Sequence, residues 1–444
     1  MDAIESISST EQRTQLRRAV VASTVGTAIE WYDFFLYSSA TGLVFAKLFF
    51  PKSDPLVGTL QAFAVYAVGF VARPIGAAIF GHYGDRMGRK AALIATLLLM
   101  GIATFAVAFV PGYAQIGVWG AVILTALRFI QGVGVGGEWG GSVLLSMEWA
   151  RTNGRRGLIA SWPQFGVPAG LFLANLAVLA FSAVTGAQFL EWGWRLPFVL
   201  SIVLVAVGLY IRLGVLETPV FARIAAENDV ERAPVAEVVR RSGKEIVLSA
   251  LVRLSEQAPF YIFTAFVFAY ATQALNADRN LVLYGILGAA ALEFVTIPYF
   301  GHLSDRIGRR RMYMLGAATM GIFGFVYFAL LNTLSPVLIV VAIVASLIPH
   351  AMQYGPQASF IAENFPGRVR YSGASLGYQL ASLIAGGPAP LIAVALLGQF
   401  RTGYAIAVYI LGCAVVSLLA AQALGDYANR DLAAEYDTVP AGAL

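Results

Sequence analysis

The chain of 444 residues is 58% hydrophobic and only 12% charged, with a mean hydropathy of +0.72. Soluble domains carry about 25% charged residues, so this composition excludes a soluble globular protein and predicts an integral membrane protein. The net charge of +5 fits basic clusters at an anionic lipid surface rather than nucleic-acid binding, while one cysteine and three histidines exclude an intramolecular disulfide and disfavour a metal site.

Twelve apolar stretches are long enough to cross a bilayer as helices, which takes about 20 residues each. Residues 217–245, between the sixth and the seventh stretch, hold eleven charged side chains and predict a solvated linker with short helices after Pro219 and Pro234. The predicted fold class is an all-α membrane protein with 12 transmembrane helices in two six-helix bundles. The stretches begin near residues 19, 56, 91, 115, 157, 195, 246, 281, 312, 335, 371 and 402.

The polar start of the chain lacks the pattern of a cleaved signal peptide, so the first apolar stretch is expected to be retained. With the N-terminus in the cytoplasm, 22 Lys and Arg residues fall inside and five outside, and this bias places both termini in the cytoplasm. The predicted organisation is a cytoplasmic N-terminal segment (1–18), an N-terminal bundle (19–216), a cytoplasmic linker (217–245), a C-terminal bundle (246–424) and a cytoplasmic tail (425–444).

Two loop sequences occur once in each half of the chain. GHYGDRMGRK at 81–90 returns as GHLSDRIGRR at 301–310, and EWARTNGRRG at 148–157 is echoed by ENFPGRVRYSG at 363–373. Matching landmarks predict two parallel structural repeats, as in transporters whose site lies between two halves at mid-membrane. Asp85 and Asp305 in these loops are short acids suited to accept hydrogen bonds at a helix end or from a nearby Arg.

The first apolar stretch carries two acids, Glu30 and Asp33, on the same helix face as Tyr37. A carboxylate at the bilayer centre costs about 3 kcal/mol, so we expect this face to point at a cavity. A permanent ion pair with a basic side chain is the alternative for either acid. A functional role is favoured for Asp33.

Other polar residues in the spans are candidates for the lining of that cavity. Arg73 and Glu293 occupy equivalent positions of the two repeats and either serve the cavity or bond within their own halves. The candidates of the fifth, tenth and eleventh stretches are favoured to bridge helices by hydrogen bonds over binding a ligand. Glu256 and Gln257 form a polar cluster just before Pro259, and interrupted helices of this kind commonly flank sites. Arg253 is expected to extend to the lipid surface and His350 to be structural. The remaining candidates are Gln164, Glu256, Gln257, Tyr261, Tyr354, Gln357, Tyr378 and Gln379.

The glycine-rich stretch at 132–137 matches G-x-G-x-x-G, but it lies in a membrane span without the strand that a dinucleotide site requires. Gly132, Gly136 and Gly140 instead form a stripe of small residues that predicts close helix contact.

Several motifs resemble those of one known family: GTAIEWYDFFLY, ARPIGAAIFGHYGDRMGRK, RFIQGVGVGGEWGG, EWGWRLPFVLS, LETPVF and RYSGASLGYQ. Over residues 17–424 the chain resembles the metabolite:proton symporters of the major facilitator superfamily. Tyr83 departs from the superfamily loop, which usually has an aliphatic residue there. The resemblance implies that the repeated loops latch one conformation by bridging helices of the same half, with Glu148 and Glu363 as ionic partners. The implied gating residues are Gly81, Asp85, Arg86, Gly88, Arg89, Glu148, Asp305, Arg306, Gly308, Arg309 and Glu363.

The resemblance also implies how transport is energised. Asp33 would be the protonatable carboxylate and Arg128 its conformation-dependent counter-charge, with Glu138 as the alternative proton carrier and Glu30 nearby. An acid that is buried alone binds its proton more tightly than one beside a guanidinium, so a helix movement that joins or parts them can load and release a proton.

These observations lead to one functional hypothesis: proton-coupled uptake of a small polar metabolite, an organic acid, by alternating access. An osmolyte symporter of the proline or betaine type and an exporter of the same fold remain alternatives. No catalytic constellation for an enzyme is present, and two latched repeats favour rocking over a channel. We expect a monomer in a bacterial plasma membrane, driven by the proton gradient without a cofactor or metal.

Overall fold

The computed structural model describes residues 9–53, 55–150, 155–226, 231–267, 270–271 and 275–427. Residues 1–8 of the predicted N-terminal segment, 227–230 of the predicted linker and 428–444 of the predicted tail lie outside this description. Within the described ranges the regular secondary structure is entirely helical, as the sequence predicts.

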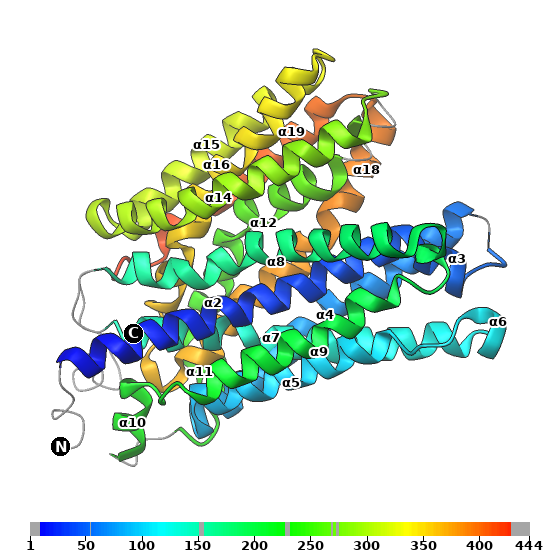
Figure 1. The fold of residues 1–444 in the computed structure, drawn as a ribbon. Helices are drawn as coiled ribbons and strands as arrows, with labels where there is room; N and C mark the ends of the chain where they lie inside the picture. Colours follow the sequence, from blue (N-terminus) through cyan, green and yellow to red (C-terminus); the bar gives the residue numbers. More distant parts are fainter. Residues whose placement is uncertain are drawn as a thin grey trace.

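The first half of the chain forms the helices drawn from blue to green in Figure 1. They are α2 (Ser9–Ala40), η1 (Thr41–Phe45), α3 (Ala46–Phe49), α4 (Pro55–Met87), α5 (Arg89–Val107), α6 (Tyr113–Ile116), α7 (Trp119–Glu148), α8 (Arg156–Thr185), η2 (Gly186–Leu190) and α9 (Arg195–Leu213).

A connecting segment and the second half follow. They comprise α10 (Pro219–Ala226), α11 (Pro234–Val252), α12 (Leu254–Tyr261), η3 (Ile262–Phe266), α14 (Arg279–Ile307), α15 (Arg309–Leu331), α16 (Pro336–Ala362), η5 (Gly367–Val369), α17 (Arg370–Ala381), η6 (Ser382–Gly386), α18 (Pro388–Phe400) and α19 (Gly403–Ala423).

Eleven helical stretches of the described residues are long and apolar enough to cross a membrane. The remaining predicted span corresponds to α2, which carries Glu30 and Asp33, is not among these eleven, and packs along α8, α7 and α9. The expected linker helices are present too, because α10 begins at Pro219, and α11 begins at Pro234 and is kinked at Ser242 before it enters the membrane span. Proline at the first turn costs no helical hydrogen bond, so these prolines mark helix starts.

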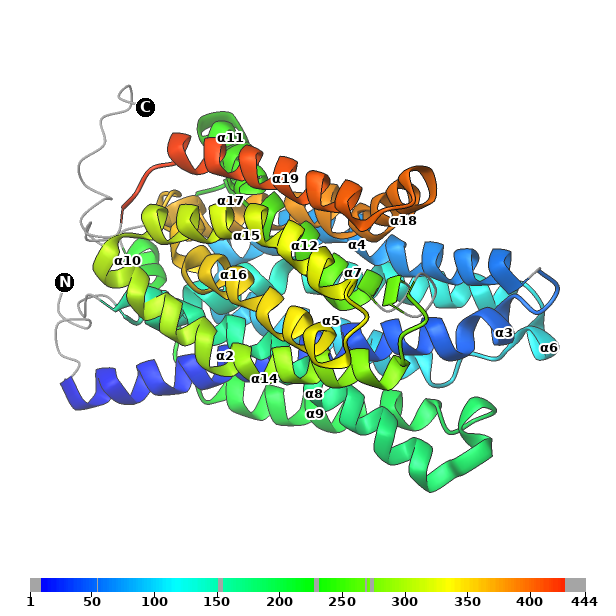
Figure 2. The same ribbon diagram turned by 90° about the horizontal axis from the view of Figure 1, so that it is seen from above.

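The long helices run roughly along one direction, and the two halves lie against each other (Figures 1 and 2). The helices α14, α15, α16, α18 and α19 lie on one side, and α2, α4, α5, α7 and α9 on the other. Contacts between the halves are made mainly by α8 with α14 and α16, and by α17 with α4 and α7. The candidate polar residues lie on these helices and on α2 and α12.

Small residues allow the closest of these helix contacts. A Cβ on Gly132 would run into the backbone of Gly69 on α4, and one on Gly136 would run into the carbonyl oxygen of Arg73. Gly140 faces Ser375 on α17 in the same way. The predicted glycine stripe is therefore confirmed: it seats α7 on α4 and on the second half.

Candidate functional site

Two buried arginines of the first half converge on one aromatic ring. The guanidinium carbon of Arg73 on α4 lies 5.1 Å from the ring centre of Phe34, and that of Arg128 on α7 lies 5.5 Å from it. Arg73 and Arg128 are each only 4% exposed. Neither has a carboxylate within 4 Å among the described residues. The acids Glu30 and Asp33 interact with Arg73 and Arg128, respectively, only over longer distances, so the two desolvated cations lie together without a direct ion pair.

Aromatic side chains provide the surroundings of both guanidinium groups. Arg73 also lies 4.6 Å from the ring centre of Phe70, and Arg128 lies 4.4 Å from that of Tyr37. Tyr261 of the second half packs its ring 5.9 Å from Phe70. Cation–π contacts stabilise a buried cation without neutralising it, so the charge remains available to an anionic ligand.

Asp33 and Arg128, the predicted pair, are not in direct contact in this conformation. Asp33 Oδ2 accepts a hydrogen bond from Thr104 (2.9 Å), which itself accepts one from Gln131 Nε2 (2.6 Å). Gln131 Oε1 accepts from Arg128 over 3.5 Å. Two polar side chains that the sequence did not single out therefore connect the acid to the cation, while Asp33 Oδ1 is buried without a hydrogen bond.

Glu138, the alternative proton carrier, is already paired with a cation. It forms a buried ion pair with Arg212 of α9 and accepts hydrogen bonds from Thr96 (3.0 Å) and Ser142 (2.9 Å). The Arg212 side chain is only 2% exposed, so it serves this ion pair and not the surface of the protein. Glu30 is also buried, and its Oε2 has no hydrogen-bond partner in the described part of the chain.

The second half buries its own set of charges. Arg253 forms an ion pair with Glu256 (3.1 Å), and His350 contacts Glu256 (3.2 Å) and Glu293 (2.5 Å). Gln357 Nε2 donates to Glu256 Oε2 (2.9 Å). The expectation that Arg253 reaches the lipid surface is wrong, because it is 1% exposed and held inside by this network.

These contacts answer the question that the sequence left open for the two mirrored charges. Glu293 bonds within its own half, to His350. Arg73 makes no ion pair within its half among the described residues and lies against the aromatic centre instead. Equivalent positions of the two repeats thus have different roles.

Other predicted lining residues form the contact between the halves. Trp139 of α7 stacks on Tyr378 of α17 with ring centres 3.7 Å apart, and its Nε1 donates to Gln164 Oε1 (2.9 Å). Gln379 Nε2 donates to the carbonyl of Val135 (3.4 Å). The helix-bridging interpretation of these residues fits their contacts. Of the remaining candidates, Tyr354 Oη lies 3.4 Å from Tyr378 Oη, and Gln257 Nε2 donates to Ser382 within the second half.

The repeated loops hold the two halves together at one end of the molecule. Asp85, at the end of α4, accepts hydrogen bonds from the backbone N–H of Tyr371 (3.2 Å) and Ser372 (2.9 Å) at the start of α17. Asp305, at the end of α14, accepts from the N–H of Gly157 (2.8 Å) and Leu158 (3.0 Å) at the start of α8. Each acid therefore caps a helix N-terminus of the opposite half, where a negative charge is stabilised.

Ion pairs reinforce both caps across the halves. Glu148 lies 3.6 Å from Arg89 and 3.8 Å from Arg370 of the second half, and Glu363 lies 3.5 Å from both Arg309 and Arg156 of the first half. The expected ionic partners are thus present. The Arg89–Glu148 and Arg309–Glu363 pairs bridge helices of the same half, as the resemblance implies. The same loops also join one half to the other, which was not expected.

A positive φ angle explains why both loops have a glycine at the same position. Gly88 has φ of +108° and Gly308 has φ of +99°, a conformation that L side chains rarely adopt. Arg89 and Arg309, the next residues, point inward to Asp85 and Asp305 at 3.3 and 2.6 Å.

The remaining gating candidates lie around these caps. Arg86 and Arg306 are exposed, and Gly81 packs its backbone against Ser372 of the other half. Sequence reasoning missed Glu217, which accepts from the N–H of Arg89 and Lys90 at 3.1 Å each, although the motif LETPVF contains it.

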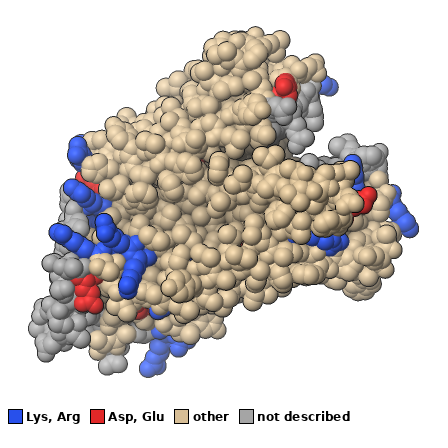
Figure 3. Space-filling model, in the orientation of Figure 1, with Lys and Arg blue, Asp and Glu red and all other residues tan. Residues whose placement is uncertain are grey.

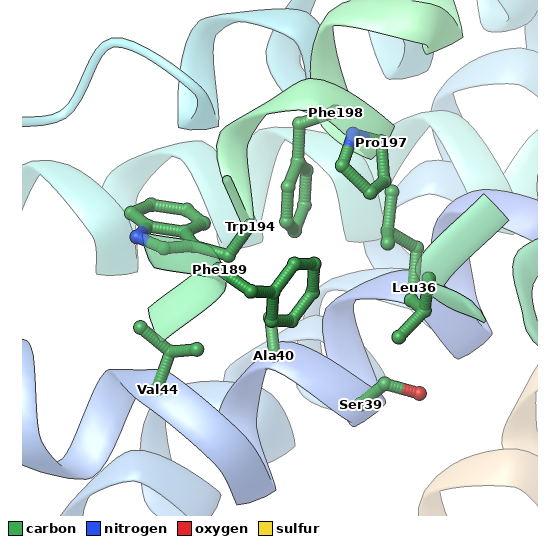
Figure 4. A pocket seen from close by; sticks show the side chains of 9 residues that line it. Leu36, Ser39, Ala40, Val44, Phe189, Trp194, Pro197 and Phe198 are labelled. Atoms are coloured by element: carbon green, nitrogen blue, oxygen red, sulfur yellow. The ribbon is translucent and has the colours of Figure 1, made fainter. Parts of the chain in front are cut away.

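A small apolar pocket lies apart from all of these groups. It lies between α2, α8, η2 and α9, and Leu36, Phe189, Trp194 and Phe198 are among its lining residues (Figure 4). It holds no charged side chain and is not the candidate site. No cluster of potential metal ligands occurs among the described residues.

Long apolar helices in two halves, eleven of them apolar enough to cross a membrane in the described chain, together with buried charges and latches at one end, are the features of a membrane transporter. Two family models match: "Sugar (and other) transporter" over residues 18–245 and "MFS/sugar transport protein" over residues 140–365. The chain belongs to this transporter family of the major facilitator superfamily, and it is not an enzyme.

Relatives and solved structures agree with this assignment. The chain is 40% identical to the inner membrane metabolite transport protein YhjE of Escherichia coli (91% of this chain, 92% of the relative) and 41% identical to the shikimate transporter of that species (93% and 95%). It is 30% identical to the E. coli proline/betaine transporter (94% and 85%). Its fold matches the proton:xylose symporter XylE with a TM-score of 0.77 at 16% identity, over 96% of this chain and 99% of that one.

Proposed function

We propose that the protein is a proton-coupled importer of a small organic acid and that Arg73 and Arg128 bind its carboxylate. One observation supports this proposal most strongly. Two buried guanidinium groups lie against Phe34, and neither has a carboxylate within 4 Å in the described chain. An anionic ligand would supply the missing counter-charge, and arginine is well suited to bind a planar carboxylate through two hydrogen bonds.

The aromatic surroundings favour an acid over an osmolyte. A box of Phe34, Phe70 and Tyr37 resembles the aromatic cages that bind quaternary ammonium groups. Here the two guanidinium groups already lie against these rings, so a ligand cation would be repelled. An acid with an apolar or hydroxylated ring, of which shikimate is one example, matches both the charge and the aromatic walls.

The orientation that we propose indicates which side of the membrane this conformation opens to. Lys and Arg side chains gather at the end of the molecule that holds the described ends of the chain (Figures 1 and 3), which the positive-inside bias places in the cytoplasm. Asp85 and Asp305 close the halves together at that end. A hollow separates the two lobes at the opposite end (Figure 3), so this conformation would receive its substrate from outside.

Asp33 supplies the proposed coupling to protons. Its carboxylate connects to Arg128 through Thr104 and Gln131 in place of a direct ion pair. A carboxylate ligand bound to Arg128 would compete with Asp33 for the same cation. Protonation of Asp33 removes this competition, so substrate and proton would bind together.

The test is uptake by the purified protein in proteoliposomes. Shikimate, benzoate, proline and glycine betaine are supplied outside, with the interior alkaline or with equal pH on both sides. The proposal requires accumulation of at least one of the acids and dependence of that accumulation on the pH gradient. Uptake of glycine betaine or proline alone would support the osmolyte alternative and would refute the assignment of an acid.

A further inference from the structure

A buried charge cluster of the second half has no part in the mechanism proposed above. Glu256 on α12, Glu293 on α14 and His350 on α16 meet between three helices, and Arg253 joins them through Glu256. None of the four residues is more than 3% exposed. Burying two carboxylates in a membrane protein is costly unless their charge is compensated.

The geometry at His350 calls for one proton more than a neutral imidazole between two carboxylates supplies. Its Nδ1 lies 2.5 Å from Glu293 Oε1, and its Nε2 lies 3.2 Å from Glu256 Oε1. A neutral imidazole has only one N–H, so one ring nitrogen would direct its lone pair at a carboxylate oxygen. The arrangement is satisfied when one further proton is present and both nitrogens donate.

Charge balance leads to the same conclusion. With the proton, Arg253 and His350 offset the two carboxylates, and the cluster is neutral. Without it, a net charge of −1 is left in a dry interior. Gln357 donates to Glu256 but carries no charge, so it cannot replace the proton. The other titratable groups that face the cluster from the neighbouring helices are phenols, which stay neutral near pH 7; they are Tyr261 on α12, Tyr313 on α15, Tyr354 on α16 and Tyr378 on α17.

Two aromatic rings stack against His350 and hold its imidazole in position. Phe260 lies 4.8 Å from its ring centre at an interplanar angle of 29°, and Tyr354 lies 4.9 Å away at 26°. The two carboxylates occupy its edges. The ring therefore cannot turn away from Glu256 and Glu293 without a movement of α12 or α16.

The cluster is also connected to the contact between the halves. Arg253 donates to the carbonyl oxygen of Tyr378 (2.5 Å), and its guanidinium carbon lies 3.3 Å from the ring centre of the same residue. The Tyr378 ring also stacks on Trp139 of the first half, with ring centres 3.7 Å apart. Separating the halves at the latched end breaks that stack and admits water beside Arg253.

We propose that Glu256, His350 and Glu293 form a second proton-binding site, which holds one proton in the conformation closed at the latches and releases it when that end opens. The proposal rests on the proposed proton-coupled transport, but it places the site in the other half from Asp33. Of the groups that contact the proton, His350 carries it and the two glutamates hold it in place.

The first test needs no substrate. The imidazole nitrogens of the purified protein in lipid nanodiscs are labelled with nitrogen-15, and the His350 signal is identified by its loss in a His350→Gln/Glu293→Gln variant. We expect an imidazolium at pH 7.5, well above the midpoint of about 6.5 for free histidine. Glu293→Gln should move the midpoint down by more than one pH unit, whereas the control Glu191→Gln, on the surface, should leave it unchanged. A neutral His350 at pH 7, or a midpoint that Glu293→Gln does not move, would overturn the proposal.

The second test addresses the role of the proton in transport. The His350→Gln/Glu293→Gln variant removes one positive and one negative charge, so the remaining Arg253–Glu256 pair is balanced and folding is protected. We expect counterflow exchange of shikimate to persist and accumulation driven by a pH gradient to fall at least tenfold. Accumulation at the wild-type level would refute the role. If the wild-type protein itself does not transport shikimate, the proposed substrate fails, while the histidine titration still decides the proton site.

Discussion

The conformational equilibrium can be shifted most directly by weakening the two latches, which are the contacts of Asp85 with α17 and of Asp305 with α8. Asp85 accepts three hydrogen bonds from the start of α17, including one from Ser372 Oγ (2.8 Å), and Asp305 accepts two from the start of α8. Each hydrogen bond to a charged group contributes about 1.5–3 kcal/mol. Asparagine keeps one acceptor oxygen but loses the charge, so the double variant Asp85→Asn/Asp305→Asn should lose about 3 kcal/mol of latch energy, a shift of roughly a hundredfold in the population of open and closed states.

The readout is the accessibility of the interface that the latches close. The single native cysteine, Cys413, is buried, so a Ser375→Cys substitution adds a selective label site at a position that is 0% exposed and faces Gly140. In inside-out vesicles, a membrane-impermeant thiol reagent should label this cysteine at least tenfold faster in the double variant.

The control is Arg17→Gln, which changes an exposed charge on α2 outside both latches and should leave the labelling rate unchanged. Equal rates in the double variant and the parent protein would refute the assignment of the latches, since the caps would then contribute nothing to closing that end.

Three further changes test other parts of the account. Glu138→Gln removes the ion-pair partner of the buried Arg212 and should destabilise the protein by about 3–5 kcal/mol, measured as a lower melting temperature in detergent. The double variant Glu138→Gln/Arg212→Gln should recover much of this loss, and no change in the single variant would contradict the ion pair. Gly136→Ala drives a Cβ into the backbone of α4 and should cost about 1–3 kcal/mol, whereas Gly412→Ala, with nothing within 4 Å, should not destabilise; equal melting temperatures would argue against the tight α4–α7 contact. Asp33→Asn should abolish accumulation driven by a pH gradient but keep counterflow exchange, and unchanged accumulation would remove Asp33 from the coupling step.

The architecture was predictable because its signals are local. Apolar stretches of about 20 residues reveal spans, and a ten-residue motif that recurs at 81 and 301 reveals the repeat. The stripe of Gly132, Gly136 and Gly140 predicted close packing from spacing alone, since helical residues four apart lie on one face.

The partners of buried charges were not predictable in the same way. Asp85 and Tyr371 are 286 positions apart, and neither motif indicates that the loop of one half contacts a helix of the other. Arg212 lies at the end of a span, where a basic residue usually meets lipid head groups, and only the packing of α9 turns it toward Glu138. His350 looked structural because its two carboxylates come from two other helices, 57 and 94 positions away.

The central claim is that two cations without a direct ion pair, Arg73 and Arg128, form the binding site for an acid. The most direct measurement is the affinity for shikimate of the purified wild-type protein and of Arg73→Gln and Arg128→Gln, with the exposed Arg401→Gln as control. We predict at least a tenfold weaker affinity in each of the first two variants and no change in the control. Wild-type affinity in both Arg73→Gln and Arg128→Gln would contradict the claim.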